Sequence, residues 1–118
     1  MGARKNDILQ GTLVLLILKT LAAGKRMHGY AITAHVQRVS DQLLRVEEGS
    51  LYPALYRMAR KGWITAEWGV SENNRRAKFY HLTAEGRRQF RDQTSGWQRF
   101  AAAVDQAVTS TVAPSWAR

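Results

Sequence analysis

Residues 50–68, SLYPALYRMARKGWITAEW, change their hydrophobic period halfway along, from that of a helix to that of a strand. The first part predicts a helix over residues 50–61. Ser50 is a good N-cap, and Pro53 falls in the first turn, where a missing N–H does no harm. Gly62 is the residue type that commonly follows the end of a helix. We expect this helix to bury one apolar stripe, made of Leu51, Leu55, Met58 and Ala59.

The strand pattern that follows this helix predicts a β-hairpin. Apolar and polar side chains alternate in residues 63–68 and again in residues 78–82. The residues between them, 69–76, are rich in turn formers and end in two arginines, so we expect a long, basic tip. Trp63 and Trp68 are interpreted as the core of the hairpin, and stacking platforms for nucleic-acid bases are the alternative.

Two further helices are expected before this segment. Residues 8–23 place apolar side chains at helical spacing, with Asp7 as the N-cap and Gly24 after the end. A second helix is expected over residues 29–39, and irregular chain connects it to the helix that begins at Ser50.

The fourth and longest helix is expected over residues 84–112. Thr83 is its N-cap, although Gly86 stands where a capping box would have Glu or Gln. Its apolar side chains exceed what one small domain covers and recur at the spacing of paired helices, which predicts a dimer interface. Packing on the first helix of the same chain is the alternative. The predicted interface comprises Leu13, Phe90, Trp97, Phe100, Ala101, Val104 and Val108.

Three short helices followed by a two-stranded hairpin is the order of a winged helix-turn-helix, a mainly α fold of the α+β kind. We expect a winged-helix DNA-binding domain over residues 1–82. A C-terminal dimerisation helix should span residues 83–112, and residues 113–118 should form a flexible tail.

The composition limits the classes of function that this protein can have. The 118 residues carry 18 Lys and Arg against 9 Asp and Glu, a net charge of +9 that favours nucleic acid as the partner. The longest apolar run is six residues, residues 13–18, too short to span a bilayer, and the N-terminus is too polar for a secretory signal. We therefore expect a soluble cytoplasmic protein that has no membrane partner.

The sequence offers no basis for an enzyme, a cofactor or a metal site. It has no cysteine, no phosphate-binding loop and no nucleophile motif. His28, His35 and His81 lack a carboxylate or a third ligand at a metal-binding spacing.

The candidate contacts with double-stranded DNA lie on the helix that begins at Ser50 and on the hairpin. An α-helix fits the major groove, its start attracts a phosphate, and a basic tip can lie on neighbouring phosphates or in the minor groove. A covering role for the two tyrosines and ordinary loop charges in the hairpin are the alternatives. The predicted contacts are Ser50, Tyr52, Tyr56, Arg57, Arg75, Arg76 and Lys78.

Several motifs resemble the PadR family of bacterial transcriptional regulators. They are Gly11-Thr12-Leu13, His28-Gly29-Tyr30, residues 48–55 (EGSLYPAL), Gly62-Trp63-Ile64 and residues 78–86 (KFYHLTAEG), in that order. The resemblance covers residues 9–100, and in that family the Leu-Tyr-Pro run starts the recognition helix. Asn73-Asn74 stands where wings of the family often have glycine.

This resemblance implies a homodimeric repressor that reads an inverted repeat, of the compact branch with a single C-terminal helix. It also implies a small planar aromatic effector near the dimer interface. Trp97 is interpreted as a packing residue of that interface, and stacking on a flat ligand is the alternative. The alternative for the whole protein is a winged-helix RNA-binding or protein-interaction module without operator specificity.

Overall fold

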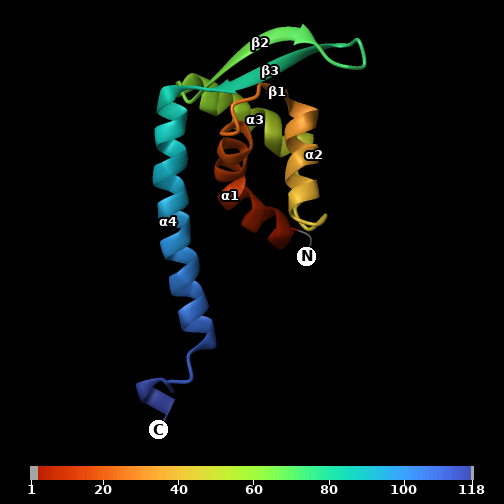
Figure 1. The fold of residues 1–118 in the computed structure, drawn as a ribbon. Coiled ribbons are helices and arrows are strands. Elements are labelled where there is room, and N and C mark those ends of the chain that lie inside the picture. The colour runs from red at the N-terminus through yellow and green to blue at the C-terminus, as the bar shows by residue number, and fades with distance from the viewer. Residues whose placement is uncertain (1–2, 118) are drawn as a thin grey trace.

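A computed structural model of the chain describes residues 3–117, and side chains for residues 12–116. Four helices lie on one side of a small sheet, and the last helix extends beyond the others (Figure 1), so the molecule measures 66 × 32 × 22 Å. This is the predicted winged helix-turn-helix. The elements are α1 (Ala3–Leu21), β1 (Met27–His28), α2 (Gly29–Val39), α3 (Glu48–Arg60), β2 (Ile64–Val70), β3 (Arg76–Leu82), α4 (Ala84–Thr109) and a 3₁₀ turn (Ser115–Ala117).

The first two helices differ in how well their bounds were predicted. The prediction that Asp7 caps α1 is wrong, because α1 begins at Ala3 and continues through Asp7. The preceding Ala, Arg and Lys are good helix formers, so nothing in that segment stops the helix. Gly24 follows the end of α1 with φ +93°, as a residue after a helix often does. α2 spans residues 29–39, as predicted.

α3 begins two residues before its predicted start, and the N-cap is Glu47 rather than Ser50. Ser50 therefore lies inside the first turn, where its backbone N–H donates to the Glu47 carbonyl at 3.0 Å. The shift also moves Pro53 out of the first turn. Because proline has no N–H, the carbonyl of the exposed Gly49 lacks its usual i+4 donor within the helix.

The C-terminal end of α3 is as predicted. Gly62 adopts φ +79°. Its N–H donates to the Ala59 carbonyl at 3.0 Å, and the N–H of Trp63 donates to the Met58 carbonyl at 3.0 Å. These paired bonds form a Schellman motif, which turns the chain directly from the helix into the hairpin.

The sheet contains a strand that the sequence did not predict. β1 is only two residues long and pairs with β3, so the antiparallel order is β1-β3-β2. A strand of two residues is too short to give an alternating pattern. The hairpin pairs Ile64 with Leu82 and continues to Val70 with Arg76, which leaves a tip shorter than predicted, residues 71–75. Asn74 supplies the left-handed residue of that tip, at φ +59°.

One face of the hairpin has two environments. At its base, Ile64 and Tyr80 are buried against the helices, and burial, followed by the nearby Tyr52, raises the pKa of Tyr80. Nearer the tip the same face projects beyond the helices. Trp68 lies there and is 58% exposed, so its prediction as hairpin core is wrong. Trp63, which packs against the buried cluster, fits that prediction.

The core lies between the helices and the base of the sheet. Leu13 is 4% exposed within this core, so its prediction as a dimer-interface residue is wrong: the chain itself covers it. Phe90 of α4 also packs against the core, which supports the own-chain alternative for that residue. The core comprises Leu13, Ile17, Leu18, Leu21, Ile32, Leu51, Ala54, Leu55, Met58, Ile64 and Tyr80.

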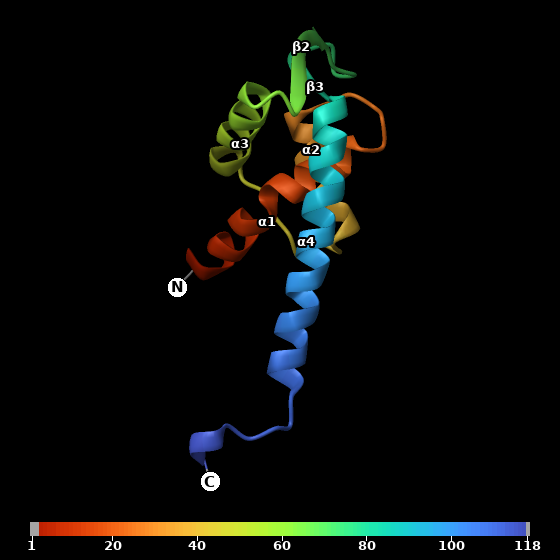
Figure 2. The same cartoon turned by 90° about the vertical axis from the view of Figure 1, so that its left-hand side faces the viewer.

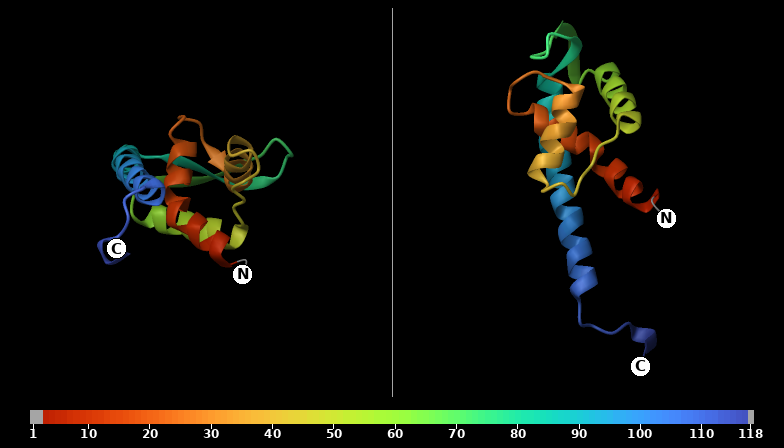
Figure 3. Two further views of the ribbon diagram at one scale, coloured as in Figure 1. Left: turned by 90° about the horizontal axis from the view of Figure 1, so that it is seen from below. Right: turned by 90° about the vertical axis from the view of Figure 1, so that its right-hand side faces the viewer.

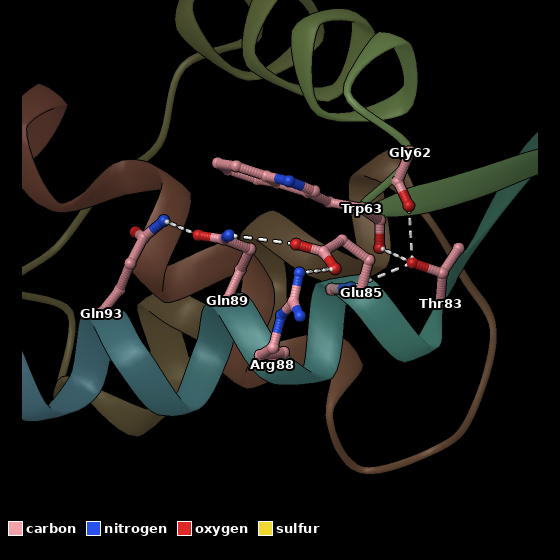
Figure 4. Close-up of polar contacts among 8 residues, drawn as sticks. Gly62, Trp63, Thr83, Glu85, Arg88, Gln89 and Gln93 are labelled. Atoms are coloured by element: carbon pink, nitrogen blue, oxygen red, sulfur yellow. Dashed lines mark hydrogen bonds and ion pairs between the residues drawn. The ribbon is translucent and has the colours of Figure 1, made fainter.

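α4 begins at a polar junction with α3 and β2, which we call the Thr83 junction (Figure 4). The Thr83 hydroxyl accepts from the Gly86 N–H at 3.0 Å, as an N-cap should. Its single proton is shared between the carbonyl oxygens of Gly62 and Trp63, at 2.7 and 2.9 Å. A Cβ at Gly86 would overlap the Trp63 carbonyl oxygen. That overlap explains why a capping-box Glu or Gln is absent at position 86.

Past this junction α4 leaves the rest of the fold. Its N-terminal part packs beside α1, whereas its C-terminal part extends past α1, α2 and α3 (Figures 2 and 3). The helix ends at Thr109, three residues before the predicted end. Within the described residues, none of the helices combines the length and the apolar character that crossing a bilayer requires.

Candidate nucleic-acid interface

A groove of about 1040 Å³ lies between α3 and the hairpin, and we call it the α3–wing groove. The two elements that form it lie at the end of the molecule farthest from the C-terminus (Figure 2). Its charged side chains are all basic, and no carboxylate is among its described lining residues. A concave basic surface of this kind attracts a polyanion. The side chains that decide its chemistry are Tyr30, Tyr52, Tyr56, Trp68, Arg75, Arg76 and Lys78.

α3 presents its polar side to this end of the molecule because its apolar side is buried. Leu51, Leu55 and Met58 are almost inaccessible. Helical spacing then turns Tyr56 and Arg57 outward, and Tyr56 is 65% exposed. The sequence therefore predicted correctly which side of this helix is buried and which is exposed.

The start of α2 supports α3 through a close contact. A Cβ at Gly29 would lie 2.5 Å from the Tyr52 hydroxyl oxygen, so glycine allows the Tyr52 ring to lie directly on the backbone of α2. His28 caps α2, because its Nδ1 accepts from the Ala31 N–H at 3.1 Å. Composition alone did not reveal this role of His28. Among the described residues, none of the histidines belongs to a cluster that could hold a metal ion.

The hairpin contributes a tryptophan and two cations to the groove. Trp68 pairs directly with Lys78, and Arg76 is two residues further along the same strand face. The guanidinium carbon of Arg76 lies 4.6 Å from the Trp68 ring centre, and the Lys78 Nζ lies 5.5 Å from it. Both distances are within the range of a cation–π interaction.

The opposite face of the hairpin holds a different kind of cation. Arg26 Nη1 lies 3.0 Å from Glu67 Oε1, and its guanidinium carbon lies 4.4 Å from the Phe79 ring centre. Gly69 fits closely beside Phe79 and Arg26. This contact attaches the segment before β1 to the hairpin and neutralises Arg26, so it supports the wing structurally.

The structure gathers most of the predicted DNA-contact residues. The groove is lined by Tyr52, Tyr56, Arg75, Arg76 and Lys78. Arg57 is exposed on α3 but does not line the groove, and Ser50 is half-buried in the first turn of α3.

Tyr30 and Trp68 of the groove were not among the predicted DNA contacts, although base stacking by Trp68 was an alternative that the sequence left open. Tyr30 lies in the motif His28-Gly29-Tyr30, which could have drawn attention to it. Trp68 alternates correctly with the other strand residues, but the pattern does not say where along the strand the core ends.

A second surface with exposed rings lies on the projecting part of α4. Trp97, Phe100, Val104 and Val108 are exposed, and Ala101 between them is half-buried. The rings of Trp97 and Phe100 are adjacent, with centres 6.2 Å apart. We call these five residues the α4 stripe.

Comparisons with known proteins agree with one another. The family model described as the transcriptional regulator PadR-like family matches residues 17–92. A solved transcriptional regulator from Clostridium thermocellum is 26% identical, with a TM-score of 0.76 over 85% of this chain and 96% of that one. A PadR family transcriptional regulator from Eggerthella lenta is 25% identical, with a TM-score of 0.75 over 93% of each chain.

Two further proteins show the same degree of similarity. A PadR-like transcriptional regulator from Bacillus cereus is 25% identical, with a TM-score of 0.74 over 88% of this chain and 98% of that one. An uncharacterized protein of Lysinibacillus sphaericus is 25% identical over 101 residues, which are 86% of this chain and 92% of that protein.

Proposed function

The chain belongs to the PadR-like family of transcriptional regulators, and from this premise we propose that it is a homodimeric repressor that reads an inverted-repeat operator. Membership makes it a DNA-binding transcriptional regulator with a winged helix, and not an enzyme. The single observation that carries the proposed mode of binding is the α3–wing groove, which is basic and has no carboxylate in its described lining.

In this proposal α3 enters the major groove of the duplex. Tyr56 and Arg57, on its outward side, reach a base edge or a phosphate. Ser50 and Tyr52 lie nearer the start of the helix, where hydroxyl groups and the helix dipole favour a phosphate. The wing cations Arg75, Arg76 and Lys78 bind neighbouring phosphates.

The α4 stripe is the proposed dimer interface. Several large apolar side chains in a row on one helix, without cover from their own chain, are typical of protein–protein contact. The chain then divides into a DNA-binding domain over residues 1–82, a dimerisation segment over residues 83–112 that contains α4, and a tail over residues 113–118. Two-fold symmetry would place two copies of α3 about 34 Å apart, one turn of the duplex.

We also propose that a small planar aromatic effector binds at the α4 stripe and releases the DNA. The adjacent exposed rings of Trp97 and Phe100 support this role, because aromatic faces favour a flat ligand. Titration of a panel of aromatic compounds should quench the tryptophan fluorescence, and Trp97→Phe should remove most of the change. Absence of quenching across the panel would contradict the effector part of the proposal only.

The central test is selection of bound fragments from a random duplex pool, performed with the purified full chain. We expect the selected fragments to contain an inverted repeat with half-site centres about one helical turn apart. When that repeat overlaps a promoter, we expect the protein to repress expression of a reporter gene in the bacterial cytoplasm. Recovery of single half-sites would contradict the dimeric mode. Weak duplex binding without any enriched sequence would instead favour an RNA-binding or protein-interaction module.

A further inference from the structure

The hairpin, which forms the wing, has two cations that contact an aromatic ring and are not neutralised by a carboxylate among the described residues. Arg76 and Lys78 both lie beside the indole ring of Trp68, at 4.6 and 5.5 Å from its centre. In the described part of the chain neither cation forms an ion pair with a carboxylate. A neutral ring attracts a cation through its quadrupole and leaves the full positive charge available.

Arg26 on the opposite face of the hairpin shows what a structural cation looks like in this protein. It lies over Phe79 in the same way, but it also pairs with Glu67. Its charge is therefore already paired with a carboxylate of the same chain, at the surface. Arg76 and Lys78 keep the ring contact and lack the carboxylate, which is the arrangement that a phosphate-binding pair requires.

The exposure of Trp68 also needs an explanation that the core does not supply. Ile64 and Tyr80 already fill the buried part of this sheet face, and Trp68 is 58% exposed nearer the tip. A large exposed apolar ring gains little stability for the fold there. Its neighbours on that face are the wing cations.

We propose that Trp68 is a positioning residue, which orders Arg76 and Lys78 toward the α3–wing groove before DNA binds. Long cationic side chains lose rotamer freedom when they bind phosphate, and a cation that is already ordered loses less. This inference rests on the proposed function, because it assumes that both cations bind phosphate.

The first experiment compares Trp68→Leu and Trp68→Phe in binding of the full-length protein to the selected duplex, followed by fluorescence anisotropy over a range of salt concentrations. We expect Trp68→Leu to weaken binding about tenfold, since a dimer has two wings, and Trp68→Phe to stay within about twofold because it keeps a ring. The salt dependence should not change, because both cations remain and the number of neutralised phosphates is the same.

The matched control is Trp116→Leu, which removes an exposed tryptophan far from the groove and should bind like the wild type. Circular dichroism of each variant checks that the fold is retained. Binding by Trp68→Leu that equals or exceeds the wild type would overturn the proposal. A reduced salt slope for Trp68→Leu would overturn it as well, because fewer phosphates would then be neutralised even though both cations remain.

A double-mutant cycle separates positioning from direct contact between Trp68 and DNA. Arg76→Gln with Lys78→Gln should reduce the salt slope by about 0.9 for each phosphate that is no longer neutralised. In that background Trp68→Leu should have less than about a twofold further effect, because the cations that it orders are gone. A persisting tenfold loss would mean that Trp68 touches DNA and would overturn the proposal.

The two proposals fail in different ways. If the wild type selects no duplex, or if the Arg76 and Lys78 substitutions change neither affinity nor salt slope, the proposed mode of DNA binding is wrong. If those substitutions behave as expected and Trp68→Leu does not couple to them, only the role of Trp68 is wrong.

Discussion

The α3–wing groove and the α4 stripe both expose aromatic rings, yet they lie in opposite surroundings. Tyr56 in the groove is 65% exposed and Phe100 in the stripe is 61% exposed, so exposure does not distinguish them. Tyr56 has the Arg60 guanidinium 5.9 Å from its ring centre, whereas Phe100 has Trp97 beside it. Rings among cations in a concavity suit a polyanion, and rings among aliphatic side chains on a single helix suit another protein. The neighbours of an exposed ring therefore indicate its partner.

The Thr83 junction connects these two surfaces. One hydroxyl contacts the carbonyls that follow α3 and also caps α4 (Figure 4). The direction of α4 relative to α3 is therefore fixed by a few short hydrogen bonds. In a dimer formed through α4, the same bonds would set the spacing between the two copies of α3.

A substitution that disrupts the proposed dimer interface at the α4 stripe should have the largest effect, on both the oligomeric state and the affinity for DNA. Val104→Glu places a charge in the proposed interface, and we expect dissociation of the dimer in analytical ultracentrifugation. Affinity for the inverted repeat should then fall by at least about a hundredfold, because the second half-site no longer binds intramolecularly. Gln106→Glu, on the opposite side of α4 by helical spacing, is the matched control and should remain dimeric. A dimeric Val104→Glu variant would remove the stripe from the interface.

A substitution that disrupts the Thr83 junction should have the next largest effect, on the free energy of unfolding. In Gly86→Ala the new Cβ would overlap the Trp63 carbonyl oxygen, and we expect a loss of about 3 kcal/mol in the free energy of unfolding, measured by urea denaturation. Gly49→Ala is the control, since a Cβ there meets no atom within 4 Å and should be neutral or stabilising by up to about 1 kcal/mol. Equal effects of the two substitutions would mean that the Trp63 carbonyl can move aside.

The sequence predicted the elements whose signals are local. Gly62 ends α3 and Thr83 caps α4 because each makes hydrogen bonds within a few residues of its own position. α3 began earlier than expected because Glu47, a poor capping residue, can precede the helix without a side-chain cap bond. Local preferences were outweighed there and at Pro53, which lies inside the helix.

The features that the sequence missed depend on distant parts of the chain. β1 exists because β3 lies beside it, and Trp68 is exposed because the tip half of the hairpin projects beyond the helices (Figure 1). Leu13 has the correct helical spacing, but spacing alone does not distinguish a core from an interface. The candidate DNA residues could be named from the sequence, whereas the assembly of five of them around one groove required the hairpin register.

Within the α3–wing groove region, base contacts and phosphate contacts should respond differently to substitution. Arg57→Ala should cost about 1–3 kcal/mol of binding free energy, concentrated at one base position, if the guanidinium reads a base edge. Affinities measured for a set of singly substituted operators test this. Arg91→Ala, an exposed arginine on α4, is the control and should bind all operators like the wild type. A uniform loss across operators would make Arg57 a phosphate contact.

The smallest effect concerns the acid stability of the first turn of α4, beside the Thr83 junction, and leaves both surfaces in place. Glu85, in the first turn of α4, accepts hydrogen bonds from Arg88 and from Gln89, the latter at 3.2 Å (Figure 4). The bond from Arg88, followed by that from Gln89, lowers the pKa of Glu85 below its ordinary value. A lowered pKa in the folded state means that the ionised carboxylate stabilises the fold above the unfolded-state pKa. This stabilisation is lost as the pH falls through the folded-state pKa.

Glu85→Gln should therefore lower the melting temperature slightly at neutral pH, and the difference from the wild type should close as the pH falls through the lowered folded-state pKa of Glu85. Asp105→Asn removes a carboxylate further along α4 that has no part in the Arg88 and Gln89 hydrogen bonds, so it controls for loss of charge alone. Affinity for the operator at neutral pH should not change in either variant, because neither residue lies in the groove or the stripe. A difference that persists at acidic pH would mean that Glu85 contributes through packing or the neutral hydrogen bonds that glutamine cannot replace.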